Sequence, residues 1–92
     1  MDRFTLQLSP AAVRDLDRLE ERAGRKILEK LTLLKDDPFP RGKLIRKIKG
    51  KRSTFYRLRI ESYRAFYMIE GRDVVILKII DKKDAERFIK DL

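Results

Sequence analysis

Three arginines in the stretch FYRLRIESYRAFY, residues 55–67, have the type and spacing of an anion-binding site. Polar and apolar residues alternate on both sides of positions 61 and 62, a pattern that predicts two strands joined by a two-residue turn. In that register Arg59 lies opposite Arg64, and Arg57 lies on the same face of the sheet. Because like charges placed opposite each other destabilise an antiparallel pair, we expect this face to bind an anion.

The excess positive charge is concentrated near the same stretch. The chain has 24 Lys and Arg against 15 Asp and Glu, and residues 41–60 contain nine of the basic residues and no acidic one. The rest of the chain is therefore electrically balanced. A focused basic patch is typical of phosphate contacts, and the alternative is a solvated face that only maintains solubility. The basic residues that we expect to contact RNA are Arg46, Lys47, Lys49, Lys51, Arg52 and Lys82.

The composition excludes several kinds of chemistry. The absence of Cys and His removes disulfides, thiolate metal sites and the commonest metal ligand and general base, so we expect no metal and no small-molecule cofactor. The absence of Asn, a single Gln and 42% charged residues favour a thermophilic source. There is no apolar run of about 20 residues and no signal-peptide pattern. We therefore expect a cytoplasmic protein with no membrane partner.

The arginines must be positioned by a small fold, which we expect to be one domain over residues 1–92. The patterns predict strands at 3–8, 44–49, 55–60, 63–69 and 74–80, helices at about 10–19, 22–35 and 82–90, and loops between them. The fold class is then α+β. It consists of an N-terminal strand, a two-helix hairpin packed on an antiparallel sheet of about four to five strands, and a short C-terminal helix.

The helical hairpin is expected to cover one sheet face and to leave the arginines on the other. Its boundary between helices falls either at Gly24 or at Glu20 and Glu21. In the first helix, Ala12, Val13, Leu16 and Leu19 are predicted to face inward, and Arg14, Asp15, Asp17 and Arg18 outward. We expect Phe39, in the loop after the second helix, to pack against the core. Residues 50–54 read as a flexible, charged connection.

Four short motifs stand out in the second half of the chain: Lys49-Gly50, Tyr56-Arg57-Leu58-Arg59, Tyr63-Arg64-Ala65-Phe66-Tyr67 and Lys82-Lys83-Asp84. With these motifs the chain resembles the RelE/ParE superfamily of toxins of type II toxin-antitoxin systems, in a RelE-like form of archaeal or thermophilic type. The helical hairpin and the loop at 37–38 also fit, so the resemblance covers essentially the whole chain.

The resemblance implies a toxin that a cognate antitoxin protein holds inactive and that cleaves mRNA on the ribosome. It places Arg57, Arg59, Arg64 and Lys83 at the catalytic positions. Two alternatives stay open: a ParE-like inhibitor of DNA gyrase, and a catalytically inactive RNA-binding or antitoxin-binding relative. The chain departs from the family at Glu86, near the position of a tyrosine in many active members, and no residue in the hairpin is an evident general base.

Overall fold

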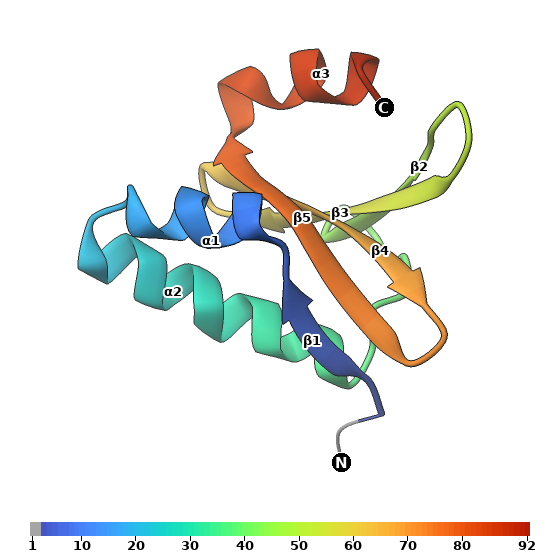
Figure 1. Ribbon diagram of the computed structural model, residues 1–92, viewed down its shortest axis with the longest axis horizontal. Helices are drawn as coiled ribbons and strands as arrows, with labels where there is room; N and C mark the ends of the chain where they lie inside the picture. The colour runs from blue at the N-terminus through green and yellow to red at the C-terminus, as the bar shows by residue number, and fades with distance from the viewer. Residues whose placement is uncertain (1–2) are drawn as a thin grey trace.

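The computed structural model describes residues 3–92 and shows a twisted sheet with helices on both of its faces (Figure 1). This arrangement confirms the predicted α+β class, the helical hairpin and the short C-terminal helix. In chain order the elements are β1 (Thr5–Leu8), α1 (Pro10–Asp17), α2 (Glu21–Thr32), the short 3-10 helix η1 (Leu33–Lys35), β2 (Ile45–Lys49), β3 (Thr54–Ile60), β4 (Tyr63–Glu70), β5 (Asp73–Asp81) and α3 (Lys82–Lys90).

The sheet has the strand order β1-β5-β4-β3-β2. Strands β2 to β5 form the predicted antiparallel meander. β1 pairs with β5 in parallel, so the sheet is mixed, whereas we predicted an antiparallel one. The physical reason is the helical hairpin that follows β1, because it carries the chain across the sheet before β2 begins. β1 is therefore left beside β5, the last strand, and not beside β2 (Figure 1).

A capping residue fixes the start of the helical hairpin. Ser9 Oγ accepts a hydrogen bond from the Ala12 backbone N–H at 3.1 Å, which satisfies one of the free donors at the start of α1. The break between α1 and α2 covers residues 18–20. Of the two boundaries that were open, the one at Glu20 is therefore close to the observed break, and Gly24 lies inside α2.

The core lies between the helical hairpin and one face of the sheet. Tyr67, on β4, is wholly buried there. Its hydroxyl donates to the Pro38 carbonyl at 2.7 Å, and its ring stacks on Tyr56 with 5.5 Å between centroids. Because a buried hydroxyl needs a partner, this hydrogen bond fixes the loop after η1 against the sheet. The buried cluster consists of Ala12, Ile27, Leu31, Leu34, Ile45, Leu58, Ile60, Ala65, Tyr67, Val74, Ile76 and Ile79.

Three side chains differ from the predictions. Phe39 is 49% exposed instead of packed in the core, because the neighbouring Pro38 fills that place and accepts the tyrosine hydrogen bond. Val13 is 42% exposed and Asp15 is only 8% exposed, the reverse of what we predicted. Asp15 follows Ala12 by three residues, which places both on the same face of the helix.

The buried carboxylate of Asp15 covers a free edge of the sheet. β1 pairs only with the first half of β5, which leaves the edge of the second half open. Asp15 accepts hydrogen bonds from the Ile79 backbone N–H and from Lys78 Nζ, both at 2.9 Å. Ser9 Oγ donates to the Leu77 carbonyl at 3.0 Å. Two side chains from the start of the helical hairpin therefore satisfy this edge.

α3 lies over the sheet face that the helical hairpin leaves free (Figure 1). Asp81 caps α3 by accepting a hydrogen bond from the Lys83 backbone N–H at 3.0 Å. Phe88 packs on Phe66 of β4 with 4.8 Å between ring centroids. α3 therefore covers the apolar part of this face. Among residues 3–92, no helix has the length and hydropathy needed to cross a membrane.

Candidate nucleic-acid interface

Four arginines share the sheet face that lies away from the helical hairpin, and we call them the arginine face. Arg59 pairs with Arg64 across β3 and β4, as predicted. Arg57 pairs with Arg46 across β3 and β2. Because paired residues in an antiparallel ladder project on the same side, the four side chains lie together. The turn at 61–62 produces this register, with Glu61 at a φ of 51°.

Two of these guanidinium groups are held by backbone carbonyls. Arg57 Nη2 donates to the Lys43 carbonyl at 3.2 Å. Arg64 Nη1 donates to the carbonyls of Glu61 and Tyr63 at 2.9 and 2.8 Å. These hydrogen bonds restrict the side chains before any ligand arrives, which lowers the entropy lost on binding.

Arg57 and Arg64 also bear the electrostatic cost of placing several arginines close together. Burial, and then the charges of Arg64, Arg46 and Arg59, lower the pKa of Arg57 below its ordinary value. Burial, and then Arg59, lower the pKa of Arg64, and the nearby Asp81 carboxylate partly opposes this. Arginine stays protonated in proteins, so the repulsion remains in the folded state. A bound anion would relieve it.

The arginine face has unused hydrogen-bonding capacity. Arg57 Nε is buried and has no hydrogen-bond partner among the described residues. Arg46 and Arg59 are exposed, and within residues 3–92 no carboxylate forms an ion pair with any of the four arginines. Guanidinium forks match the oxygen geometry of phosphate. Several guanidinium groups of the arginine face are therefore available to bind phosphate.

The two lysines at the start of α3 lie at the Arg64 end of this face. The Lys82 backbone N–H donates to the Ser62 carbonyl at 2.8 Å, which places the first turn of α3 beside the β3–β4 turn. Lys82 and Lys83 are both exposed. The structure thus brings the predicted catalytic residue Lys83 to the same end of the sheet as Arg59 and Arg64.

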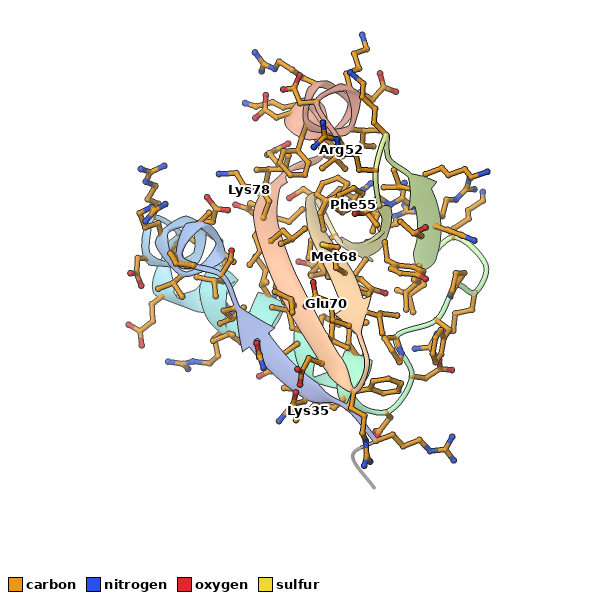
Figure 2. The ribbon with its side chains drawn as sticks, turned by 45° about the vertical axis from the view of Figure 1, so that its right-hand side comes forward. Lys35, Arg52, Phe55, Met68, Glu70 and Lys78 are labelled. Carbon is orange, nitrogen blue, oxygen red and sulfur yellow. The ribbon has the colours of Figure 1, made fainter. Side chains whose placement is uncertain are left out.

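The other predicted RNA contacts lie elsewhere. Lys47 pairs with Tyr56 and Lys49 pairs with Thr54, so these lysines project on the side of the helical hairpin. Lys51 and Arg52 lie in the β2–β3 turn, at the other end of the strand from Arg59. Figure 2 shows Arg52 and Phe55 next to α3, with Met68 and Glu70 farther along β4.

The β2–β3 turn is tighter than the flexible connection that we predicted. The Gly50 N–H donates to the Ser53 carbonyl at 2.9 Å, which continues the ladder between the strands. A Cβ at position 50 would lie 2.5 Å from the ring of Phe55, so only glycine allows this ring to pack on the turn. The turn sets the register that brings Arg46 beside Arg57, a pairing that the sequence reasoning missed.

No described side chain on the arginine face is suited to remove a proton at neutral pH. On α3, Asp84 pairs with Arg87 at 2.8 Å, and Glu86 is exposed. Tyr67 is buried on the opposite face. The described residues also contain no cluster of acidic side chains that could hold a metal ion. The arrangement can position phosphate and stabilise negative charge.

The fold and the arginine face together define a small basic α+β protein with helices on both faces of its sheet and a cluster of arginines on one of them. Over residues 6–86 the chain matches the family described as the ParE toxin of type II toxin-antitoxin system, parDE. This match spans most of the chain, and the protein belongs to that family. The match confirms the resemblance to the RelE/ParE superfamily. No curated protein sequence matches the chain.

Solved structures show the same fold. RelE in the archaeal RelE-RelB complex of Pyrococcus horikoshii OT3 is 26% identical, with a TM-score of 0.73 over 87% of this chain and 96% of that one. A chain of the Mycobacterium tuberculosis RelBE2 toxin-antitoxin complex is 23% identical, with a TM-score of 0.74 over 86% of this chain and 98% of that one. The YoeB/ParE toxin of Agrobacterium tumefaciens is 19% identical, with a TM-score of 0.67 over 85% and 98%.

Proposed function

We propose that this toxin is a ribosome-dependent mRNA endonuclease and that the arginine face clamps the scissile phosphate. The observation that carries the proposal is the group of four arginines on one face without a carboxylate partner among the described residues. Such a group is costly in the free protein and is favourable only with an anion bound. The 26% identity to an archaeal RelE supports the choice of mRNA as the substrate.

In the proposed reaction, the ribose 2′-oxygen attacks the adjacent phosphorus. A bond forms between these two atoms, and the bond from phosphorus to the 5′-oxygen of the next nucleotide breaks. The products are a 2′,3′-cyclic phosphate and a free 5′-hydroxyl. Arg57 and Arg64, which backbone carbonyls already hold, stabilise the extra negative charge on the phosphate oxygens, and the exposed Arg59 orients the phosphate.

The two protons of this reaction have different routes. Lys83 donates one to the leaving 5′-oxygen, because an ammonium group has a proton to give at neutral pH. The proton of the 2′-hydroxyl passes to water or to a group of the ribosome, since the arginine face has no acceptor among the described residues. This division of roles accounts for a dependence on the ribosome.

The proposed partner that restrains the toxin is a cognate antitoxin protein. The solved archaeal RelE is in a complex with RelB, and the mycobacterial structure is a toxin-antitoxin complex. A basic toxin is matched by acidic segments in its antitoxin, because complementary charge speeds and orients association.

The family match supports a second candidate, inhibition of DNA gyrase, since the matching family is described as the ParE toxin. The lack of a proton acceptor on the arginine face also fits an inhibitor that performs no chemistry. A third reading is an inactive relative that binds RNA without cutting it.

The test is translation of a defined message with the purified protein, followed by mapping of new 5′ ends. The proposal predicts cleavage within the codon at the ribosomal A site, and no cleavage of the same message without ribosomes. Intact mRNA together with loss of gyrase supercoiling would select the inhibitor. Intact mRNA and normal supercoiling, with RNA still bound, would select the inactive relative.

A further inference from the structure

The ring of Phe39 is an exposed aromatic group that the packing of the core does not require. The side chain is 49% exposed, although the loop that carries it is held in place. The Phe39 backbone N–H donates to Asp37 Oδ1 at 3.1 Å. The ring makes an edge-to-face contact with Phe4, with 5.7 Å between the centroids. Phe39 is therefore fixed while about half of its surface stays open to a ligand.

Two adjoining hollows lie beside these rings. The larger has a volume of about 940 Å³, and Phe39, Phe4, Arg3 and Arg72 are among the residues that line it. The second has a volume of about 500 Å³ and shares Phe4, Arg3 and Arg72 with the first. Because sites for small ligands have volumes of roughly 300–1,000 Å³, the larger hollow alone has room for a nucleotide. We call the two hollows together the Phe39 groove.

Basic side chains from three separate segments surround the Phe39 groove. Arg3 precedes β1 and Arg72 precedes β5, and the parallel pairing of these strands brings the two arginines together. Arg72 Nε donates to the Arg3 carbonyl at 3.3 Å, and both residues are exposed. Lys35, at the end of η1, lines the smaller hollow and lies at this end of the molecule (Figure 2). Three positive groups therefore lie within reach of one ligand.

The acidic residues of the Phe39 groove do not cancel this charge. Asp37 is already engaged, because its Oδ2 pairs with Arg41 Nη1 at 3.1 Å and its Oδ1 accepts the hydrogen bond from Phe39. Asp36 lines the larger hollow as well. Carboxylates accept hydrogen bonds from the amino groups of bases, so an acidic side chain in the groove is compatible with a bound base.

We propose that the Phe39 groove binds one nucleotide of a single-stranded RNA. The base stacks on the ring of Phe39, and the adjoining phosphates contact Arg3 and Arg72. Proteins bind unpaired nucleotides with this combination of an open aromatic ring and flanking basic side chains. The groove is a second site, separate from the arginine face. Arg72 precedes the first residue of β5 and Arg64 pairs with Ile80 near its end, which places them roughly 20 Å apart along the strand.

This proposal is independent of mRNA cleavage, because it uses none of the residues of the arginine face. The test is nuclear magnetic resonance of the wild-type protein during titration with a tetranucleotide of adenosine. The ring-proton signals of Phe39 are expected to move upfield and to saturate, since a stacked base shields the ring. An oligonucleotide with the same ribose-phosphate backbone and no bases is expected to leave these signals in place. Shifts confined to the arginine face would overturn the proposal.

Two substitutions of Phe39 separate stacking from mere attraction between charges. They are made in a protein whose arginine face has been changed to glutamine, so that the remaining RNA affinity reports the second site. Phe39→Leu keeps an apolar side chain but loses the ring, and it is expected to weaken binding about tenfold, whereas Phe39→Tyr keeps the ring and should bind as before. Equal affinities of the leucine and tyrosine variants would contradict the proposal.

The phosphate contacts are tested in the same background. Arg3→Gln and Arg72→Gln are each expected to lower the slope of log affinity against log salt by about 0.7. Arg22→Gln, an exposed position on α2, is the matched control and should leave the slope unchanged. A glutamate-rich peptide that shifts the Phe39 signals, when the tetranucleotide does not, would assign the groove to a protein partner and overturn the proposal.

Discussion

Replacing Arg59 with glutamine is expected to stabilise the folded protein while weakening RNA binding. The Arg59 backbone N–H donates to the carbonyl of Leu44, the residue before β2, so the pairing of Arg59 with Arg64 on β4 is the type without mutual backbone hydrogen bonds. Side chains approach most closely at such pairs. Like charges there cost roughly 0.2–1 kcal/mol, and glutamine removes the charge while keeping a similar length.

We therefore expect Arg59→Gln to raise the free energy of unfolding by about 0.5 kcal/mol, or Tm by about 2–4 °C for a domain of this size. The measurement is urea unfolding followed by circular dichroism at low salt. The gain should shrink in 1 M salt, because screening weakens the repulsion. Arg22→Gln, an exposed position on α2, is the matched control and should give no gain. A destabilised Arg59→Gln, or a gain equal to that of the control, would refute the reasoning.

Two further predictions concern the core. Asp15→Ala removes the hydrogen-bond acceptor of the Ile79 N–H and of Lys78, and it should lower the free energy of unfolding in urea by about 3 kcal/mol. Asp17→Ala, an exposed position on the same helix, should lower it by less than about 0.5 kcal/mol. Equal losses in the two variants would contradict the account of the β5 edge. Burial raises the pKa of Tyr67 above its ordinary value, so as pH rises its phenol ionises in the unfolded state before it ionises in the folded state. The stability that is present below about pH 10 should therefore fall by about 1.4 kcal/mol for each pH unit above pH 10. Tyr67→Phe should lack this part of the alkaline loss, and identical profiles would contradict it.

The central hairpin was predictable from the sequence because its pattern is local. Alternating residues on both sides of a two-residue turn fix which side chains share a face, so the pairing of Arg59 with Arg64 followed directly. The cap at Ser9 was predictable for the same reason. Its hydroxyl and the N–H that it accepts from are three residues apart.

Features that depend on distant contacts were missed. The inward position of Asp15 requires the open edge of β5, which exists only because β1 is short and lies parallel to it. One signal was available, since Lys78 is the only charge inside an apolar strand and Asp15 falls on the apolar side of its helix. The exposure of Phe39 depends on the buried tyrosine that takes the neighbouring carbonyl, and no local pattern reports that.

The site shows the same division. The three arginines of the hairpin were found by spacing, but the place of Arg46 beside Arg57 depends on the tight turn after β2. Charge alone grouped Lys47 and Lys49 with the arginines, although the alternation of the strand puts them on the other side of the sheet. The side of the sheet on which a basic side chain projects therefore decides which basic residues can contact the same phosphate.

The salt dependence of RNA binding tests the central claim, that the arginine face contacts phosphates, most directly. The variant with Arg57, Arg59 and Arg64 changed to glutamine is compared with one in which Arg14, Arg18 and Arg22, exposed on the helical hairpin, are changed in the same way, so that the net charge is equal. On a single-stranded RNA, the slope of log affinity against log salt should fall by about 2 in the first variant, about 0.7 for each lost contact, and stay near the wild-type value in the second. Equal slopes in the two variants would contradict the claim.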